Sequence, residues 1–131
     1  MNDIQKLNIK HFAHIGDACW ELYIRNKTVY LTGNLNKLHK LTVSLVNASF
    51  QTKILESIKP YLTEEELDLA KRGGNIKTGR RINRNLHRTA TELEVLVGYL
   101  YLFDKNRLSQ LQKICDKFID EELSNYEDLK D

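Results

Sequence analysis

The sequence lacks the features that would point to a secreted, disulfide-bonded or membrane-spanning protein. No apolar run approaches the roughly 18 residues needed to cross a bilayer, and the first residues lack the apolar core of a signal peptide. The two cysteines, Cys19 and Cys115, are far apart and form no Cys-x-x-Cys motif or Cys/His cluster. We therefore expect no membrane association, no disulfide and a reducing compartment.

The composition is typical of a helical globular protein. The chain has 131 residues, with one proline, six glycines, 41% hydrophobic and 29% charged residues. This length suits one domain and is short for two. We predict a single all-α domain over residues 1–123, followed by an acidic tail over residues 124–131 that frays.

Positive charge is concentrated in one segment, although the formal net charge is only +2. Residues 71–88 contain no acid, so the rest of the chain is net negative. This asymmetry favours one surface that binds a polyanion, and a solvated basic loop is the alternative. The predicted RNA-binding residues of this segment are Lys71, Arg72, Lys77, Arg80, Arg81, Arg84 and Arg88.

Hydrophobic residues at intervals of three and four predict five helices. A possible capping box begins the third, and the pair Gly73-Gly74 is expected to end it with positive φ angles. The second is expected to run unbroken until just before Pro60. The predicted helices span residues 7–25, 35–58, 63–71, 86–103 and 104–123.

The first predicted helix carries a polar stripe that includes Asp17. The stripe consists of His11, His14, Asp17, Glu21 and Arg25, which recur every three or four residues. The simplest interpretation is the solvent-facing side of an amphipathic helix. A second carboxylate is needed to favour a functional role.

Glu94 provides that second carboxylate. It precedes a segment, residues 95–103, that is apolar on every side apart from Gly98, which predicts a helix in the middle of the domain. Glycine at 98 lets another backbone approach closely. A buried carboxylate must become neutral, pair with a cation or bind a metal.

If Asp17 and Glu94 converge, their oxygens suit Mg²⁺ or Mn²⁺. A metal beside a basic segment is an arrangement for phosphodiester hydrolysis. A zinc site is a weaker alternative because its candidate ligands lack close-set pairing. Those candidates are His11, His14, His39 and His87.

Four segments carry a resemblance to a known family. They read HIGDACWELYIR (14–25), LHKLTVSLVNASFQTKIL (38–55), LTEEELDLAKRGGNIK (62–77) and RTATELEVLVGYLYL (88–102). In this order they resemble mini-ribonuclease III, the ribonuclease III relatives that consist of the catalytic domain alone. The resemblance extends over about residues 7–119.

The resemblance implies an all-helical ribonuclease III fold and a homodimer that cleaves double-stranded or structured RNA with Mg²⁺. It makes Asp17 and Glu94 the catalytic residues and metal ligands, with Mn²⁺ as a possible substitute metal. By this resemblance, full-length ribonuclease III enzymes have two further acids, at the positions of Ala13 and Thr91. The mini enzymes lack these two acids, as this sequence does. Ribosomal or other stable RNA maturation, in a bacterial cytoplasm or plastid stroma, is the implied task.

Two departures keep other functions open. Gly74 stands where the family has an arginine, and His87 stands where a tyrosine is common. Gly74 keeps open the alternative of a catalytically impaired RNA-binding accessory protein of the same fold. The apolar stripes keep open a third function, a helical scaffold that binds another protein. With no double-stranded RNA-binding module in the sequence, recognition would depend on backbone contacts that read A-form shape.

Overall fold

The computed structural model describes residues 7–76 and 84–126. Within these ranges the chain forms six α-helices and one short 3₁₀ helix, and no strand. This confirms the predicted all-α class. The elements are α1 (Ile9–Thr28), α2 (Leu35–Val46), α3 (Ala48–Ile58), η2 (Lys59–Tyr61), α4 (Glu64–Gly74), α5 (Arg84–Phe103) and α6 (Lys105–Leu123).

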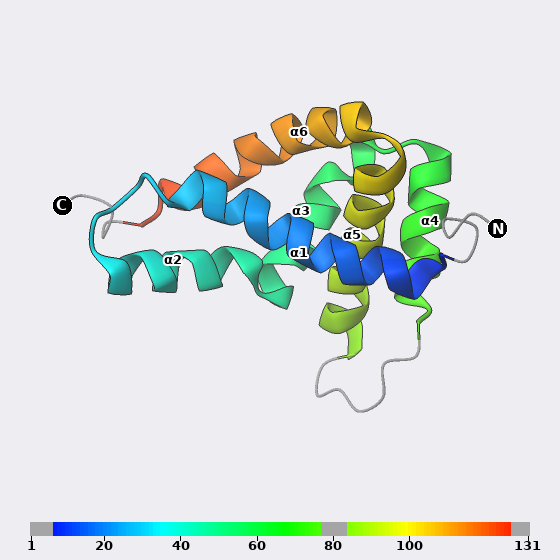
Figure 1. The fold of residues 1–131 in the computed structure, drawn as a ribbon, viewed down its shortest axis with the longest axis horizontal. Helices are drawn as coiled ribbons and strands as arrows, with labels where there is room; N and C mark the ends of the chain where they lie inside the picture. Colours follow the sequence, from blue (N-terminus) through cyan, green and yellow to red (C-terminus); the bar gives the residue numbers. More distant parts are fainter. Residues whose placement is uncertain (1–6, 77–83, 127–131) are drawn as a thin grey trace.

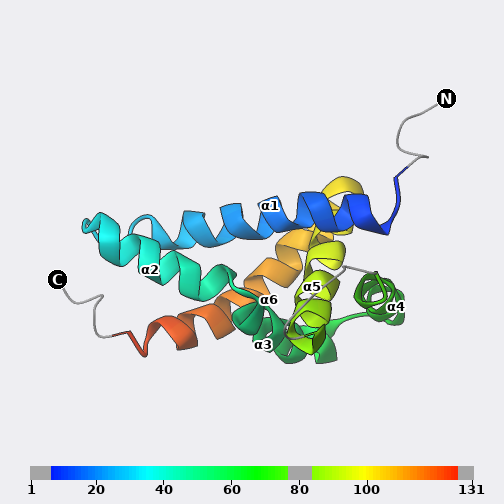
Figure 2. The same ribbon diagram turned by 90° about the horizontal axis from the view of Figure 1, so that it is seen from below.

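Helix α5 lies at the centre of the fold (Figures 1 and 2). It packs against α1, α3, α4 and α6. In Figure 1, α1 crosses in front of α5, α2 turns back beneath α1, and α6 runs along the upper edge. The two helices that carry Asp17 and Glu94 are therefore direct neighbours, as the convergence hypothesis requires.

Polar side chains at the helix starts explain where most helices begin. Asn8 and Thr63 each form a capping box, with His11 and Glu66 respectively. In both cases two backbone N–H groups that the helix leaves without a partner are satisfied. The capping box predicted at Thr63 is thus confirmed.

The core is formed by the inner faces of α1, α2, α3, α5 and α6. The Trp20 ring is 2% exposed, and its Nε1 donates a hydrogen bond to the Leu45 carbonyl at 3.1 Å. The Tyr23 hydroxyl donates to Gln112 and Asp116 on α6. Both aromatic residues therefore serve the packing of this chain.

The expected single helix over residues 35–58 is wrong, because the chain breaks at Asn47. Asn47 is extended, with φ −76° and ψ 163°, and ends α2. Its side chain accepts a hydrogen bond from the Phe50 backbone N–H and thereby starts α3. The apolar periodicity continues through the break, whereas the N-cap preference of asparagine ends one helix and starts another.

The expectation that Gly73-Gly74 would end a helix is confirmed, but the positive φ angles expected there are wrong. Gly74 is the last residue of α4, and Asn75, with φ −90°, is its C-cap. Neither glycine has a φ in the left-handed region. Their small size serves close packing against α5 instead.

Helix α5 is largely buried in its middle part but not at its C-terminal end. Leu93, Val95 and Leu96 are at most 1% exposed, whereas Leu102 and Phe103 are 41% and 44% exposed. The expectation that the whole apolar segment lies inside the domain is therefore correct only for its first part. The exposed end leaves apolar surface available.

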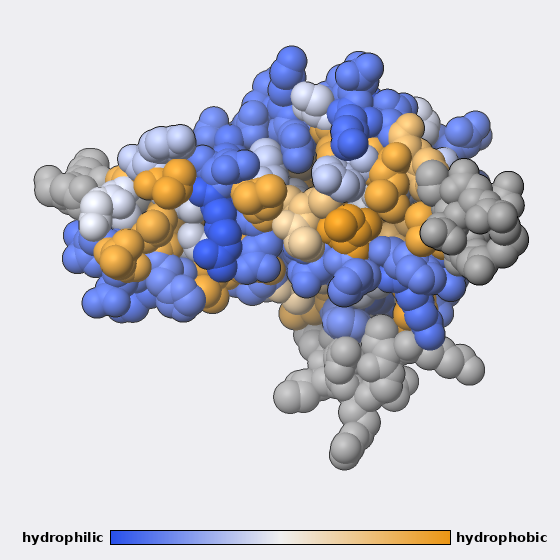
Figure 3. Space-filling view, in the orientation of Figure 1, coloured by the Kyte–Doolittle hydropathy of each residue, from blue (hydrophilic) through white to orange (hydrophobic). Residues whose placement is uncertain are grey.

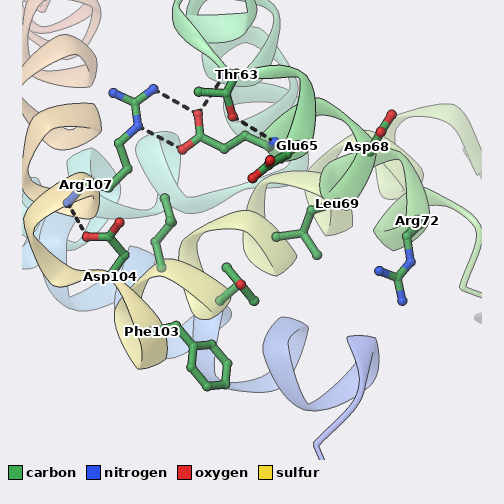
Figure 4. Close-up of a pocket in the computed structure, with 11 residues that line it drawn as sticks. Thr63, Glu65, Asp68, Leu69, Arg72, Phe103, Asp104 and Arg107 are labelled. Atoms are coloured by element: carbon green, nitrogen blue, oxygen red, sulfur yellow. Dashed lines mark hydrogen bonds and ion pairs between the residues drawn. The ribbon is translucent and has the colours of Figure 1, made fainter.

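An ion pair joins α4 to α6. The Arg107 guanidinium donates to Glu66 at 2.8 and 2.9 Å (Figure 4) and to the Tyr61 carbonyl at 2.8 Å. Glu66 also accepts the Thr63 backbone N–H, so one carboxylate caps α4 and anchors α6. Thr63, Glu66 and Arg107 also line a cleft of about 600 Å³ between α4, the end of α5 and the start of α6.

The ends of the chain are only partly described. Helix α6 ends at Leu123, and the predicted frayed tail over residues 124–131 stays a prediction, since residues 127–131 lie outside the described ranges. Among the described helices, none combines the length and apolar character required to traverse a bilayer.

Candidate active site at the α1–α5 crossing

Two glycines bring α1 and α5 into backbone contact. A Cβ placed on Gly16 would lie 1.7 Å from the Glu94 carbonyl oxygen, and one on Gly98 would lie 1.9 Å from the Phe12 carbonyl oxygen. Any other residue at these positions would force the helices apart. The close approach that the sequence predicted at Gly98 is confirmed, and it puts Asp17 beside Glu94.

Asp17 and Glu94 meet at this crossing. The Glu94 side chain is half-buried and hydrogen-bonded to both Asp17 and Gln51, whereas Asp17 is exposed. Burial, together with the hydrogen bond to Asp17 and the negative charge of Asp17, raises the pKa of Glu94 to about 8, and the hydrogen bond to Gln51 opposes this rise. Two carboxyl groups this close resist simultaneous ionisation, so the pair holds a proton unless a cation replaces it.

The two carboxyl groups lie in a cleft of about 400 Å³. The cleft also contains the two positions where full-length relatives are expected to have acids, here Ala13 and Thr91. Its lining consists of Lys10, Ala13, His14 and Asp17 from α1, Ile76 after α4, and His87, Thr91 and Glu94 from α5. Spacings of three and four on each helix turn these residues toward one another.

The donor set fits a magnesium ion. Mg²⁺ commonly takes one or two protein carboxylates and completes its shell with water and substrate phosphate. Asp17 and Glu94 would supply that pair, and the cleft is open to a larger ligand. Within residues 7–76 and 84–126 no cluster of three or more His, Cys, Asp or Glu side chains could hold a metal, which disfavours the zinc alternative.

The other members of the polar stripe on α1 serve other roles. The His11 side chain accepts the Asn8 backbone N–H at 3.1 Å and so belongs to the cap of α1. Glu21 pairs with Arg25 at 2.9 Å on the helix surface. Of the stripe, His14 and Asp17 line the cleft, and Lys10 joins them.

Lys10 and Ile76 line the cleft although neither was predicted as a site residue from the sequence. Lys10 had a detectable signal, because it precedes Asp17 by seven residues and so lies two turns away on the same helix face. Ile76 had none, since its position depends on where α4 ends and how α4 packs on α5.

The predicted RNA-binding residues lie only partly in the described structure. Residues 77–83, with Lys77, Arg80 and Arg81, and the side chain of Arg84 lie outside it. Lys71 and Arg88 are exposed. Arg72 lines the separate cleft between α4, α5 and α6 (Figure 4). Their RNA contacts stay a prediction.

Gly74, where the family has an arginine, faces α5. A Cβ at this position would lie 2.8 Å from the Arg88 Cγ and 3.0 Å from the Glu92 Cγ. The Arg88 stem therefore lies over residue 74. Arg88 on α5 thus covers position 74 on α4, where the family has an arginine and this chain has glycine.

Comparison with known proteins decides the family. The ribonuclease III domain model matches residues 10–105, a range that contains both carboxylates and every residue that lines the cleft. A protein of Gloeobacter violaceus named Mini-ribonuclease 3 is 39% identical over 117 residues, covering 88% of this chain and 87% of its own. The chain belongs to the mini-ribonuclease III family.

Further relatives agree in sequence and in fold. The Mini-ribonuclease 3 of Clostridium tetani is 34% identical over 129 residues, covering 94% of this chain and 85% of its own. A crystal structure of a Fusobacterium nucleatum protein, 34% identical, superposes with a TM-score of 0.79 over 93% of this chain and 99% of that chain. The predicted ribonuclease III fold is confirmed.

Proposed function

We propose that this endoribonuclease of the ribonuclease III family cleaves double-stranded or structured RNA with Mg²⁺ held by Asp17 and Glu94. The observation that carries the proposal is the meeting of these two carboxyl groups in an open cleft at the α1–α5 crossing. Mn²⁺ has the same preference for oxygen ligands and is the expected substitute.

The two acids have different environments and would contribute differently. Glu94 is half-buried and is oriented by the amide of Gln51, which is 3% exposed. Asp17 is exposed on the open side of the cleft, where it can reach both a cation and its substrate. A bound Mg²⁺ would activate a water molecule and offset charge on the phosphate. The chain holds the carboxylates in position through two rigid helices.

Duplex RNA is the substrate that best fits the charge distribution. The segment over residues 71–88 carries seven cations and no acid, and its residues Ile76 and His87 line the cleft, so the cations of the segment would contact the RNA backbone. Such contacts read the phosphate backbone and 2′-hydroxyl groups more than base identity. Affinity should therefore fall steeply with salt. Maturation of ribosomal or other stable RNA, in a bacterial cytoplasm or plastid stroma, is the task we propose.

We further propose that the protein acts as a homodimer. Helix α1 has a second apolar stripe opposite its buried face, formed by Ile15, Ala18 and Leu22, and Leu22 is 61% exposed. Figure 3 shows hydrophobic side chains interrupting the hydrophilic surface along this face. Exposed apolar surface of this kind marks interaction sites, and a second copy would cover it.

A cleavage assay tests the proposed function. Purified protein is incubated with a long RNA duplex, with a structured precursor RNA and with single-stranded RNA, each in Mg²⁺ and in chelator. New ends in the two structured RNAs that appear only with metal support the proposal. Metal-independent binding without new ends would contradict it and favour an RNA-binding accessory protein.

A further inference from the structure

We infer that Lys10 is a phosphate-positioning residue, which holds an RNA backbone phosphate next to the one that Asp17 and Glu94 address. This inference rests on the proposed function and adds a substrate contact to it. Of the described residues that line the catalytic cleft, Lys10 is the one lysine or arginine.

Helix geometry places Lys10 at a suitable distance. Lys10 and Asp17 are seven residues apart on α1, which is about 10 Å along the helix axis, and both line the same cleft. A phosphate bound to the metal would lie close to Asp17, because metal–oxygen bonds are only about 2 Å long. Lys10 is therefore too far from that phosphate to contact it directly. It would contact a neighbouring phosphate of the same RNA.

The Lys10 ammonium is not used by the fold. Within residues 7–76 and 84–126 it forms no ion pair, and the side chain is exposed. The hydrogen bond that Lys10 makes to the Asn8 cap comes from its backbone N–H, which a side-chain substitution leaves in place. An unpaired cation in the cleft is thus available to an anionic ligand at little cost in stability.

The neighbouring residues strengthen this assignment. Ala13 and His14 lie between Lys10 and Asp17 on the cleft wall, and Ala13 occupies a position where full-length relatives are expected to have an acid. Without that acid no carboxylate on α1 separates Lys10 from Asp17. The wall therefore changes from anionic at Asp17 to cationic at Lys10, a pattern that suits a metal at one end and a phosphate at the other.

Salt-dependent binding tests this role without relying on catalysis. Affinity for a short RNA duplex is measured in chelator, where no cleavage occurs, over a range of salt concentrations. Lys10→Met should bind more weakly and reduce the slope of log affinity against log salt by about one for each copy bound. Lys10→Arg should keep the wild-type slope. Lys113→Met, an exposed lysine on α6 outside the cleft, is the matched control and should also keep it.

Kinetics in Mg²⁺ provide the second readout. Lys10→Met should raise KM several-fold with little change in kcat, because the lost contact lies away from the reacting phosphate. If Lys10→Met and Lys113→Met have the same slope and the same KM, the inference is wrong, while metal-dependent cleavage by the wild type still supports the proposed function. If the wild type fails to cut duplex RNA, the proposed function itself is wrong.

Discussion

The backbone of Gly16 on α1 lies directly against the backbone of Glu94 on α5. A methyl group on residue 16 would lie 1.7 Å from the Glu94 carbonyl oxygen, well inside van der Waals contact. Since Asp17 follows Gly16, this contact also sets the distance between the two carboxyl groups of the cleft. The glycine is therefore as important to the site as the acids are.

Gly16→Ala should disturb both the fold and the site. Alanine raises intrinsic helix propensity by about 1 kcal/mol, but overpacking against a backbone costs about 1–3 kcal/mol or more, so the net effect is destabilising. Urea unfolding and RNA cleavage should both show a loss. Gly33→Ala is the control, because nothing lies within 4 Å of its added Cβ. Equal stability of the two variants would contradict the observed crossing.

Asp17→Asn should abolish cleavage while the protein still folds and binds RNA. The amide cannot offer a second anionic oxygen to the metal, and we expect a loss of more than about a hundredfold, since outer-sphere changes alone reach 10- to 100-fold. Glu21→Gln, on the same helix, removes a carboxylate that pairs with Arg25 outside the cleft. Cleavage by this control should persist. Activity of Asp17→Asn at the wild-type rate would refute the assignment.

The adjacent glycines of α4 should respond differently to alanine. A Cβ at Gly73 would lie 2.8 Å from the Cγ2 of Val95, which is fully buried, so Gly73→Ala should destabilise by about 1–3 kcal/mol. A Cβ at Gly74 meets the flexible stems of Arg88 and Glu92, which can move. Gly74→Ala should then be neutral or slightly stabilising in thermal unfolding. The reverse order would show that α4 packs on α5 in another register.

The Glu66–Arg107 ion pair should stabilise the fold except in acid. The hydrogen bond from Arg107 lowers the pKa of Glu66, so the stabilisation is present above the ordinary glutamate pKa of about 4.3. It is lost as the pH falls through the lower pKa of the folded state. Glu66→Gln should cost about 2 kcal/mol at pH 7, and this difference should shrink in acid.

Urea unfolding at several pH values measures this effect. Glu56→Gln is the matched control, because it removes the exposed ion pair with Lys59, and surface pairs contribute about 0–1 kcal/mol. A pH-independent difference between the wild type and Glu66→Gln would contradict the proposed role of the charge.

Sedimentation should detect the proposed dimer. The wild type, a 15.3 kDa chain, should sediment at about twice that mass, and Leu22→Glu should shift it toward the monomer because a charge would enter a covered apolar face. Leu67→Glu, a less exposed leucine on α4, should remain dimeric. A monomeric wild type at micromolar concentration would contradict the homodimer.

The sequence by itself determined the helical class, most helix positions and the two acids of the candidate site. These follow from periodicity, capping residues and the anomaly of carboxylates in apolar helices, which are properties of neighbouring residues along the chain. The break at Asn47 and the helical conformation of Gly73 and Gly74 did not follow. At Asn47 the apolar periodicity allowed either one helix or two, and glycine at 73 and 74 allowed either helical or positive φ angles.

Only the tertiary structure decided how closely α1 and α5 approach and which residues face the space between them. Gly16 and Gly98 allow another backbone to come into contact, but whether another helix packs there depends on the packing of the whole core. For the same reason Lys10 became a cleft residue and Glu21 did not. Periodicity gives each residue a direction around its own helix, whereas a site arises from the position of a second helix, which long-range packing sets.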